Sequence, residues 1–166
     1  VSANSTGSNN TGVGHSALAS NTTASYNTAV GYQSSYSNTT GLYNNNFGAT
    51  AGYSTTTGTQ NQAMGNSAFY YNSTGSYNVA LGGAALFNNT TASSNTAVGY
   101  QAMYDNTSGI DNVAMGRLAL QDNTSGSYNV ALGMNSLALN TTASNNTAVG
   151  YQAGYSSTTG ASNTFD

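Results

Sequence analysis

The chain lacks cysteine, proline, tryptophan, glutamate and lysine, and Arg117 is its only arginine. Without cysteine, disulfides cannot hold the fold. The net charge of −3 argues against binding of nucleic acid or anionic lipid, because both need clustered lysine and arginine. The sequence shows no long apolar run, no basic signal-peptide start and no initiating methionine, so we expect a mature or excerpted segment without a transmembrane span.

Titratable side chains are also scarce, which argues against catalysis. General acid–base chemistry needs paired titratable groups, and the chain offers only His15 and four aspartates. We predict that the protein is not an enzyme and has no cofactor and no metal site. Asp105 and Asp122 lie 17 residues apart. They are either solvated turn carboxylates, which we favour, or a bridge for calcium.

What the sequence does contain is a strict repeat of 17 residues without insertion or deletion. We number each unit from its asparagine. The units begin at Asn10, Asn27, Asn44, Asn61, Asn78, Asn95, Asn112, Asn129, Asn146 and Asn163. Position 4 is apolar and position 5 is glycine in every complete unit, and position 8 is alanine or serine. Such self-similarity decides the architecture before any local propensity does.

A unit this short has no room for a helical hairpin, and its composition of Asn, Ser, Thr and Gly disfavours helix. We predict a strand over positions 1–5, a second short strand over positions 8–10, as in Ala85–Phe87, and a turn in the "NTTG" segment. The fold class is therefore all-β. Residues 1–166 form a single continuous parallel β-solenoid of about ten coils, stacked about 4.8 Å apart.

Equivalent residues of neighbouring coils should lie above one another. We predict that the position-1 asparagines are buried and hydrogen-bond as a ladder, and that the position-5 glycines allow the bend after the strand. The residues assigned to this structural ladder are Asn27, Asn78, Asn95, Asn112, Asn129, Asn146, Gly31, Gly82, Gly99, Gly116, Gly133 and Gly150.

A second asparagine row matches the N-x-S/T acceptor pattern for glycosylation. Its members, at position 12, are Asn4, Asn21, Asn38, Asn72, Asn89, Asn106, Asn123 and Asn140; Asn9 and Asn145 match outside this row. The row is explained either by glycans along one stripe of the rod or by turn residues that bond local backbone. Glycans only about 4.8 Å apart would be crowded.

Tyrosine recurs at positions 6, 10 and 17, which predicts aromatic stripes along the rod. At position 10 the residues are Tyr36, Tyr53, Tyr70, Phe87, Tyr104 and Tyr155. We favour ring stacking or packing against another chain, and a platform for sugar rings is the functional alternative.

The pattern G-x-x-N-x-A-[VLM]-G-x-x-[AS], seen at Gly75–Ala85 and Gly126–Ser136, resembles the head repeat of YadA-like trimeric autotransporter adhesins and is similar to repeats of phage tail-fibre-like proteins. The resemblance implies a left-handed parallel β-roll, three chains side by side, secretion and adhesion. The unit here is longer than in those heads, and the additional residues fall in the "NTT" segment.

We therefore expect a non-enzymatic structural or adhesive fibre at the cell surface or outside the cell. Its partner is itself, as a homo-oligomer, filament or trimer, because neither end has a capping segment and open strand edges recruit another copy. Glycans or matrix surfaces are further candidate partners. The alternatives are an ice-binding protein, although adjacent hydroxyls at positions 13 and 14 would point opposite ways, and a phage tail-fibre shaft.

Overall fold

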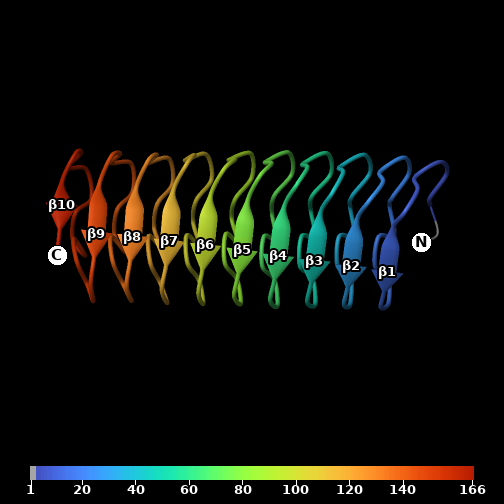
Figure 1. Ribbon diagram of the computed structural model, residues 1–166, viewed down its shortest axis with the longest axis horizontal. Helices are drawn as coiled ribbons and strands as arrows, with labels where there is room; N and C mark the ends of the chain where they lie inside the picture. Colours follow the sequence, from blue (N-terminus) through green and yellow to red (C-terminus); the bar gives the residue numbers. More distant parts are fainter. Residues whose placement is uncertain (1–2) are drawn as a thin grey trace.

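A computed structural model describes residues 3–166 as an all-β rod in which each unit forms one coil (Figure 1). Each coil contributes one strand. The strands are β1 (Thr11–Val13), β2 (Thr28–Val30), β3 (Asn45–Phe47), β4 (Gln62–Met64), β5 (Val79–Leu81), β6 (Thr96–Val98), β7 (Val113–Met115), β8 (Val130–Leu132), β9 (Thr147–Val149) and β10 (Thr164–Phe165). The predicted parallel β-solenoid is confirmed, and its strand occupies positions 2–4 of the unit.

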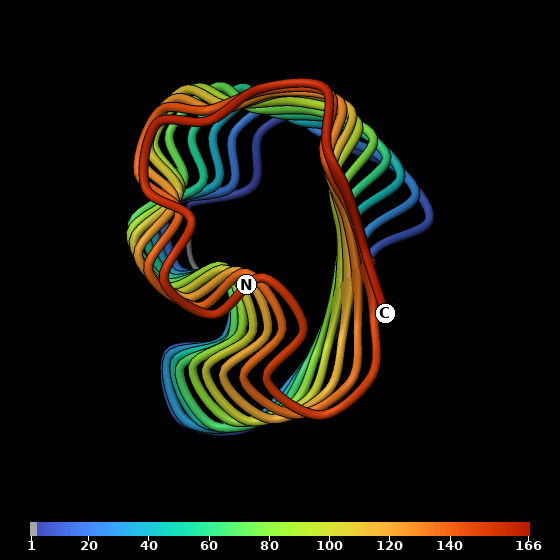
Figure 2. The ribbon, with the colours of Figure 1, turned by 90° about the vertical axis from the view of Figure 1, so that its left-hand side faces the viewer.

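The ten strands form one parallel sheet in sequence order. Each residue pairs with the residue one unit further on, as in Thr96↔Val113 and Ala97↔Ala114. Like side chains therefore stack over like along the whole rod. Figure 2 is viewed from the C-terminal end, so the chain advances toward the viewer from coil to coil. The strands lie at the right of this view, and the chain runs downward along them. Together with the downward strands at the front of Figure 1, this makes the solenoid left-handed.

The core is narrow because the strand faces the opposite wall of the coil at close range. Position 3, the inward residue of each strand, is alanine in most coils and is fully buried, as at Ala97 and Ala114. The larger buried side chains come from position 9: Leu18, Phe69, Leu86, Met103, Leu120 and Leu137. The small residue at position 3 and the large residue at position 9 together fill the space between the two walls.

One polar inclusion divides this core near the N-terminal end. Position 9 shrinks to Ser35 and Gly52 in two neighbouring coils, and Asn46 replaces the usual alanine of the strand. The Asn46 Nδ2 donates to Ser35 Oγ at 2.6 Å, and a Cβ on Gly52 would collide with the Asn46 amide. The asparagine thus occupies the volume that a position-9 side chain fills elsewhere, which separates two apolar clusters.

The predicted second strand is wrong. Positions 6–11 form turns, in which positions 7 and 9 have positive φ, as at Ala84 (54°) and Leu86 (50°). A strand needs extended backbone, which these left-handed residues interrupt. The segment still bonds its neighbours, because the Leu86 N–H donates to the Ala102 carbonyl at 3.0 Å. The stacking of coils, rather than an extended conformation, therefore stabilises this wall.

Candidate assembly surface and asparagine ladders

The position-1 asparagines form a ladder along the inside of the rod. The backbone N–H of each donates to the Oδ1 of the asparagine one coil before, over 2.8–3.0 Å. From Asn10 to Asn129, the Nδ2 of the same residue crosses the coil to the position-15 carbonyl, as from Asn95 to Gly109 at 2.8 Å. One side chain therefore joins neighbouring coils and also ties the start of the strand to the far end of its own coil.

The position-12 asparagines form a second internal ladder. Asn106 illustrates the pattern: its Nδ2 donates to Asn89 Oδ1 at 3.0 Å and to the Gly109 carbonyl at 3.0 Å. The Gly109 carbonyl also accepts from Asn95, so the two ladders meet at position 15 of the coil. The position-12 asparagines are as buried as the apolar core: from Asn21 to Asn140 they are at most 1% exposed.

The burial of the position-12 asparagines argues against glycans along this row. A glycan on Nδ2 of a position-12 asparagine would have to displace buried hydrogen bonds, and in this row only Asn4 is exposed. Asn9 and Asn145, which match outside the row, are both exposed. Asn88 also fits the pattern, as Asn88-Asn89-Thr90, but it is half-buried and its Nδ2 donates to Asp105 Oδ1. We expect glycans, if the protein matures in a glycosylating host, at Asn4, Asn9 and Asn145. Mass spectrometry of peptides across Asn72 to Asn140 separates this expectation from a glycosylated position-12 row.

The second ladder is broken where Thr55 occupies position 12. The shorter threonine side chain makes no bond to Asn38 Oδ1, and both Asn38 Oδ1 and Thr55 Oγ1 are buried without a hydrogen-bond partner. Asn140 Oδ1 lacks a partner at a similar break, where the next coil carries Ser157. Each buried polar atom without a partner destabilises the fold.

We predict that Thr55→Asn repairs the ladder. The new Nδ2 can donate to Asn38 Oδ1, and the new Oδ1 can accept from Asn72, so the free energy of unfolding should rise by about 1–2 kcal/mol. Denaturant unfolding measures the change. Thr57→Asn, two residues away at an exposed position, is the matched control and should leave stability within about 0.5 kcal/mol. Equal effects of the two variants would contradict the ladder.

The two hydroxyl rows at positions 13 and 14 differ. Position-13 hydroxyls donate to the position-13 carbonyl of the next coil, as from Thr107 Oγ1 to Thr124 O at 2.8 Å. This bond repeats from Thr22 to Thr141. Position 14, for example Thr57 and Ser108, is exposed in every coil, and its hydroxyls do not form this repeated bond. One free row, rather than two, is available to order water.

Aromatic side chains stack between coils, as the favoured interpretation of the tyrosine rows predicts. At position 10, five consecutive rings form a column with centroids 5.0–5.2 Å apart. Its members are Tyr36, Tyr53, Tyr70, Phe87 and Tyr104. Their faces cover one another, so a sugar ring cannot lie on them. Burial, with smaller effects of Tyr53 and Tyr71, raises the pKa of the Tyr70 phenol.

His15 and Asp105 make defined side-chain contacts. His15 stacks on Tyr32 with centroids 5.6 Å apart and is exposed. Asp105 accepts from Asn88 Nδ2 at 2.7 Å, and partial burial together with the neighbouring Asp105 charge raises the pKa of Asp122. Within residues 3–166, no group of three His, Cys, Asp or Glu residues is placed to hold a metal ion.

The raised pKa gives a pH dependence with a definite sign. Because folding raises the pKa of Asp122, its contribution to stability is fully present below the unfolded-state value and is lost as pH rises through the folded-state value. At pH 7 the ionised Asp122 is therefore destabilising. We predict that Asp122→Asn raises the melting temperature at pH 7 and that this gain disappears near pH 3. Asp111→Asn is the control, because it makes the same charge change at an exposed position of another row. It should not raise the melting temperature at pH 7 in the same way.

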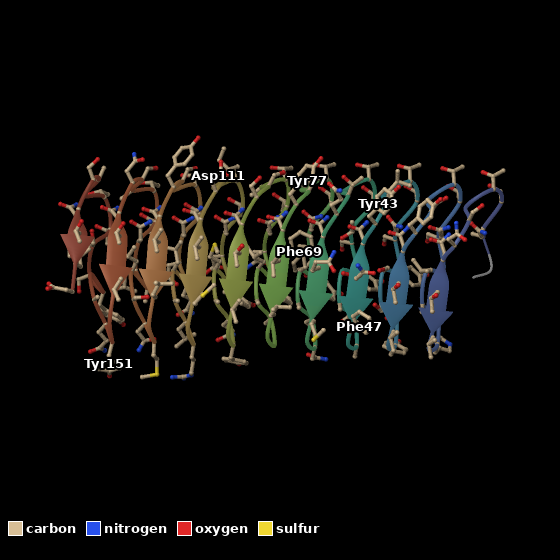
Figure 3. All side chains as sticks on the ribbon, viewed as in Figure 1. Tyr43, Phe47, Phe69, Tyr77, Asp111 and Tyr151 are labelled. Atoms are coloured by element: carbon tan, nitrogen blue, oxygen red, sulfur yellow. The ribbon has the colours of Figure 1, made fainter. Side chains whose placement is uncertain are left out.

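The outer face of the sheet is the most distinctive surface of the rod. Position 4 points outward from every complete strand and is always apolar, and five of its members are more than a third exposed: Val13, Phe47, Met64, Met115 and Val149. Beside it, position 6 adds Tyr32, Tyr100, Met134 and Tyr151, which are equally open. We call positions 4 and 6 together the apolar face. Figure 3 shows Phe47 and Tyr151 projecting from the coil, whereas Phe69 lies within it.

Charge is almost absent from this surface. Among the described residues at positions 2, 4 and 6, the charged side chains at neutral pH are Arg117 and Asp166, the last residue of the chain. The Arg117 Nη1 lies 3.9 Å from Met134 Sδ. Monomeric proteins rarely expose apolar patches that run the length of the molecule. The sequence shows the apolar row, but its exposure appears only in the structure.

Comparison with known proteins gives no relative: no family model, curated protein or solved structure matches the chain. Across residues 3–166 no helix has the length and hydropathy needed to cross a membrane.

Proposed function

We propose that this protein is a structural rod of an extracellular fibre or surface appendage, and that copies associate side by side through the apolar face. The observation that carries the proposal is the exposed row at position 4, from Val13 to Val149. Burial of apolar area drives association, and no charge repeats along the face to oppose it. The resemblance to YadA-like heads supports the extracellular and adhesive part of the proposal.

The dimensions of the apolar face approach those of a standard protein interface. Ten coils at about 4.8 Å give a length of about 48 Å, and three to five extended residues give a width of about 10–16 Å. The product is about 500–800 Å² for each partner, which approaches the roughly 800 Å² of a standard interface. Because both partners repeat every coil, side chains of one copy can fit between those of the other at every rung.

Introducing charge into the apolar face tests the proposal. We expect wild-type protein to assemble with concentration in analytical ultracentrifugation, and the double variant Met64→Asp/Met115→Asp to remain monomeric, with a dissociation constant at least about tenfold higher. Thr57→Asp/Ser108→Asp adds the same charge on the exposed position-14 row and should assemble like wild type. Monomeric wild-type protein at high concentration, or equal loss in both variants, would overturn lateral association. Electron microscopy then distinguishes long threads from discrete rods.

The ice-binding alternative is disfavoured by the same surface. An ice plane needs a flat, regular lattice of small side chains, whereas position 4 varies from Val13 to Phe47 and Met64. The position-13 hydroxyls already donate to backbone carbonyls. We expect no thermal hysteresis in concentrated solution, and measurable hysteresis would restore this alternative.

A further inference from the structure

Tyr26 and Tyr43 form an exposed, stacked pair on the position-17 edge of the rod. Their ring centroids lie 5.1 Å apart with an interplanar angle of 9°, and their side chains are 50% and 47% exposed. Backbone bonds hold both residues in place, because the Tyr26 N–H donates to Ser8 O at 3.0 Å and the Tyr43 N–H donates to Ser25 O at 3.3 Å. Two phenols are thus kept side by side and open to solvent.

Two other tyrosines at the same unit position provide an internal comparison. Tyr77 and Tyr128 are 62% and 56% exposed, and neither contacts another aromatic ring within residues 3–166. Figure 3 shows Tyr43 and Tyr77 along the same upper edge of the rod. The coils next to these two tyrosines carry Gln60, Ser94, Asp111 and Asn145 at position 17. All four tyrosines are exposed, but among them only Tyr26 and Tyr43 lie next to a second phenol.

We propose that Tyr26 and Tyr43 are a site of oxidative cross-linking, which joins two coils through a dityrosine bond. The oxidant is a peroxide acting through a heme peroxidase. Each phenol loses one hydrogen atom, and the two phenoxyl radicals form a bond between their ortho carbons, one Cε from each ring. The hydrogen displaced from each ortho carbon returns to the oxygen of its own ring. The two hydrogen atoms removed reduce one hydrogen peroxide to two waters.

The geometry favours this coupling over coupling at other tyrosines. Like residues of neighbouring coils are about 4.8 Å apart, so modest side-chain rotation brings the two ortho carbons into contact. Both rings are half-exposed, which permits that rotation and gives the oxidant access. The rings of the position-10 column also stack, but Tyr36, Tyr53 and Tyr70 are less exposed. The bond is formed within one chain and does not depend on lateral association.

A cross-link here would act as a staple between two coils. The 17-residue loop that it closes is short, and closure restricts the unfolded chain rather than adding native contacts. The rod would therefore gain resistance to fraying at the N-terminal end, where the core is interrupted by the polar inclusion at Asn46.

Peroxidase treatment of dilute full-length protein tests the proposal. We expect mass spectrometry of a proteolytic digest to show a linked peptide pair containing Tyr26 and Tyr43, two hydrogens lighter than the separate peptides, together with dityrosine fluorescence. Tyr26→Phe and Tyr43→Phe should each abolish this pair, and Tyr77→Phe should leave its yield unchanged. Phenylalanine preserves the packing, because Phe87 stacks on Tyr104 at 5.0 Å in the position-10 column.

Two results would overturn the assignment. One is the absence of the pair joining Tyr26 to Tyr43 while other tyrosines of the protein couple. The other is intramolecular coupling of Tyr77 or Tyr128 with the same yield. Circular dichroism of each variant shows that the fold is retained, so that loss of the linked peptide reports on the missing phenol.

Discussion

Gly82→Ala is expected to destabilise the rod by about 3–5 kcal/mol, enough to unfold the coils around it. Gly82 has φ +139°, and a Cβ there would lie 2.4 Å from the carbonyl oxygen of Gly99 in the next coil. The neighbouring atom is backbone, so no side chain can move aside. Strain at such a φ and overpacking each contribute about 1–3 kcal/mol. Thermal unfolding monitored by circular dichroism measures the loss.

The adjacent residue is a matched control. A Cβ on Gly83 would meet only the Tyr100 ring, at 3.4 Å, which is ordinary van der Waals contact. We expect Gly83→Ala to change the free energy of unfolding by less than about 0.5 kcal/mol. Two identical substitutions at consecutive residues should therefore differ by several kcal/mol, and similar effects would show that coils do not approach each other as closely as described.

The second large effect is expected from Asn95→Ala, at about 2–4 kcal/mol of lost stability. Asn95 Oδ1 accepts the Asn112 N–H at 3.0 Å, and Asn95 Nδ2 donates to the Gly109 carbonyl at 2.8 Å. Alanine leaves the buried Asn112 N–H without an acceptor and opens a cavity, and each unsatisfied buried group costs about 1–3 kcal/mol. Urea unfolding measures the change.

Two further variants distinguish the ladder from a general need for asparagine. Asn66→Ala removes an exposed asparagine at position 6 and should lie within about 0.5 kcal/mol of wild type. Asn95→Asp keeps the acceptor but buries a carboxylate, whose pKa burial would raise. Its stability should therefore increase as pH falls and the carboxyl becomes protonated. A ladder without energetic importance would leave Asn95→Ala as stable as Asn66→Ala.

Much of the architecture could be predicted from the repeat alone. The uninterrupted period of 17 residues determines that like residues stack, and the invariant Asn95 and Gly99 positions become ladder and bend because each coil repeats the same contact. The strand, the parallel register and the absence of helix follow from the same period and from composition. The position-10 stacking follows from recurrence of aromatic residues one coil apart.

Other features have no clear signature in the sequence. Ala85–Phe87 has the composition of a strand, but Leu86 adopts positive φ, which leucine rarely does. The position-12 asparagines match both an acceptor motif and a turn pattern, and neither alternative predicts that they form a buried ladder like that of position 1. The sequence shows that position 4 is apolar, but only the structure shows that it faces outward while position 3, as at Ala97, faces the core.

The in-register stacking of Thr96 on Val113 and Ala97 on Ala114 has an evolutionary consequence. A gene with near-identical segments recombines unequally, and most proteins are broken by such exchanges. Here the gain or loss of a whole unit reproduces the same junction, because every unit begins with asparagine, as Asn95 follows Ser94 and Asn112 follows Asp111. The length of the rod can therefore change by whole modules, each about 4.8 Å tall, while the strand register and the position-1 asparagine ladder are kept.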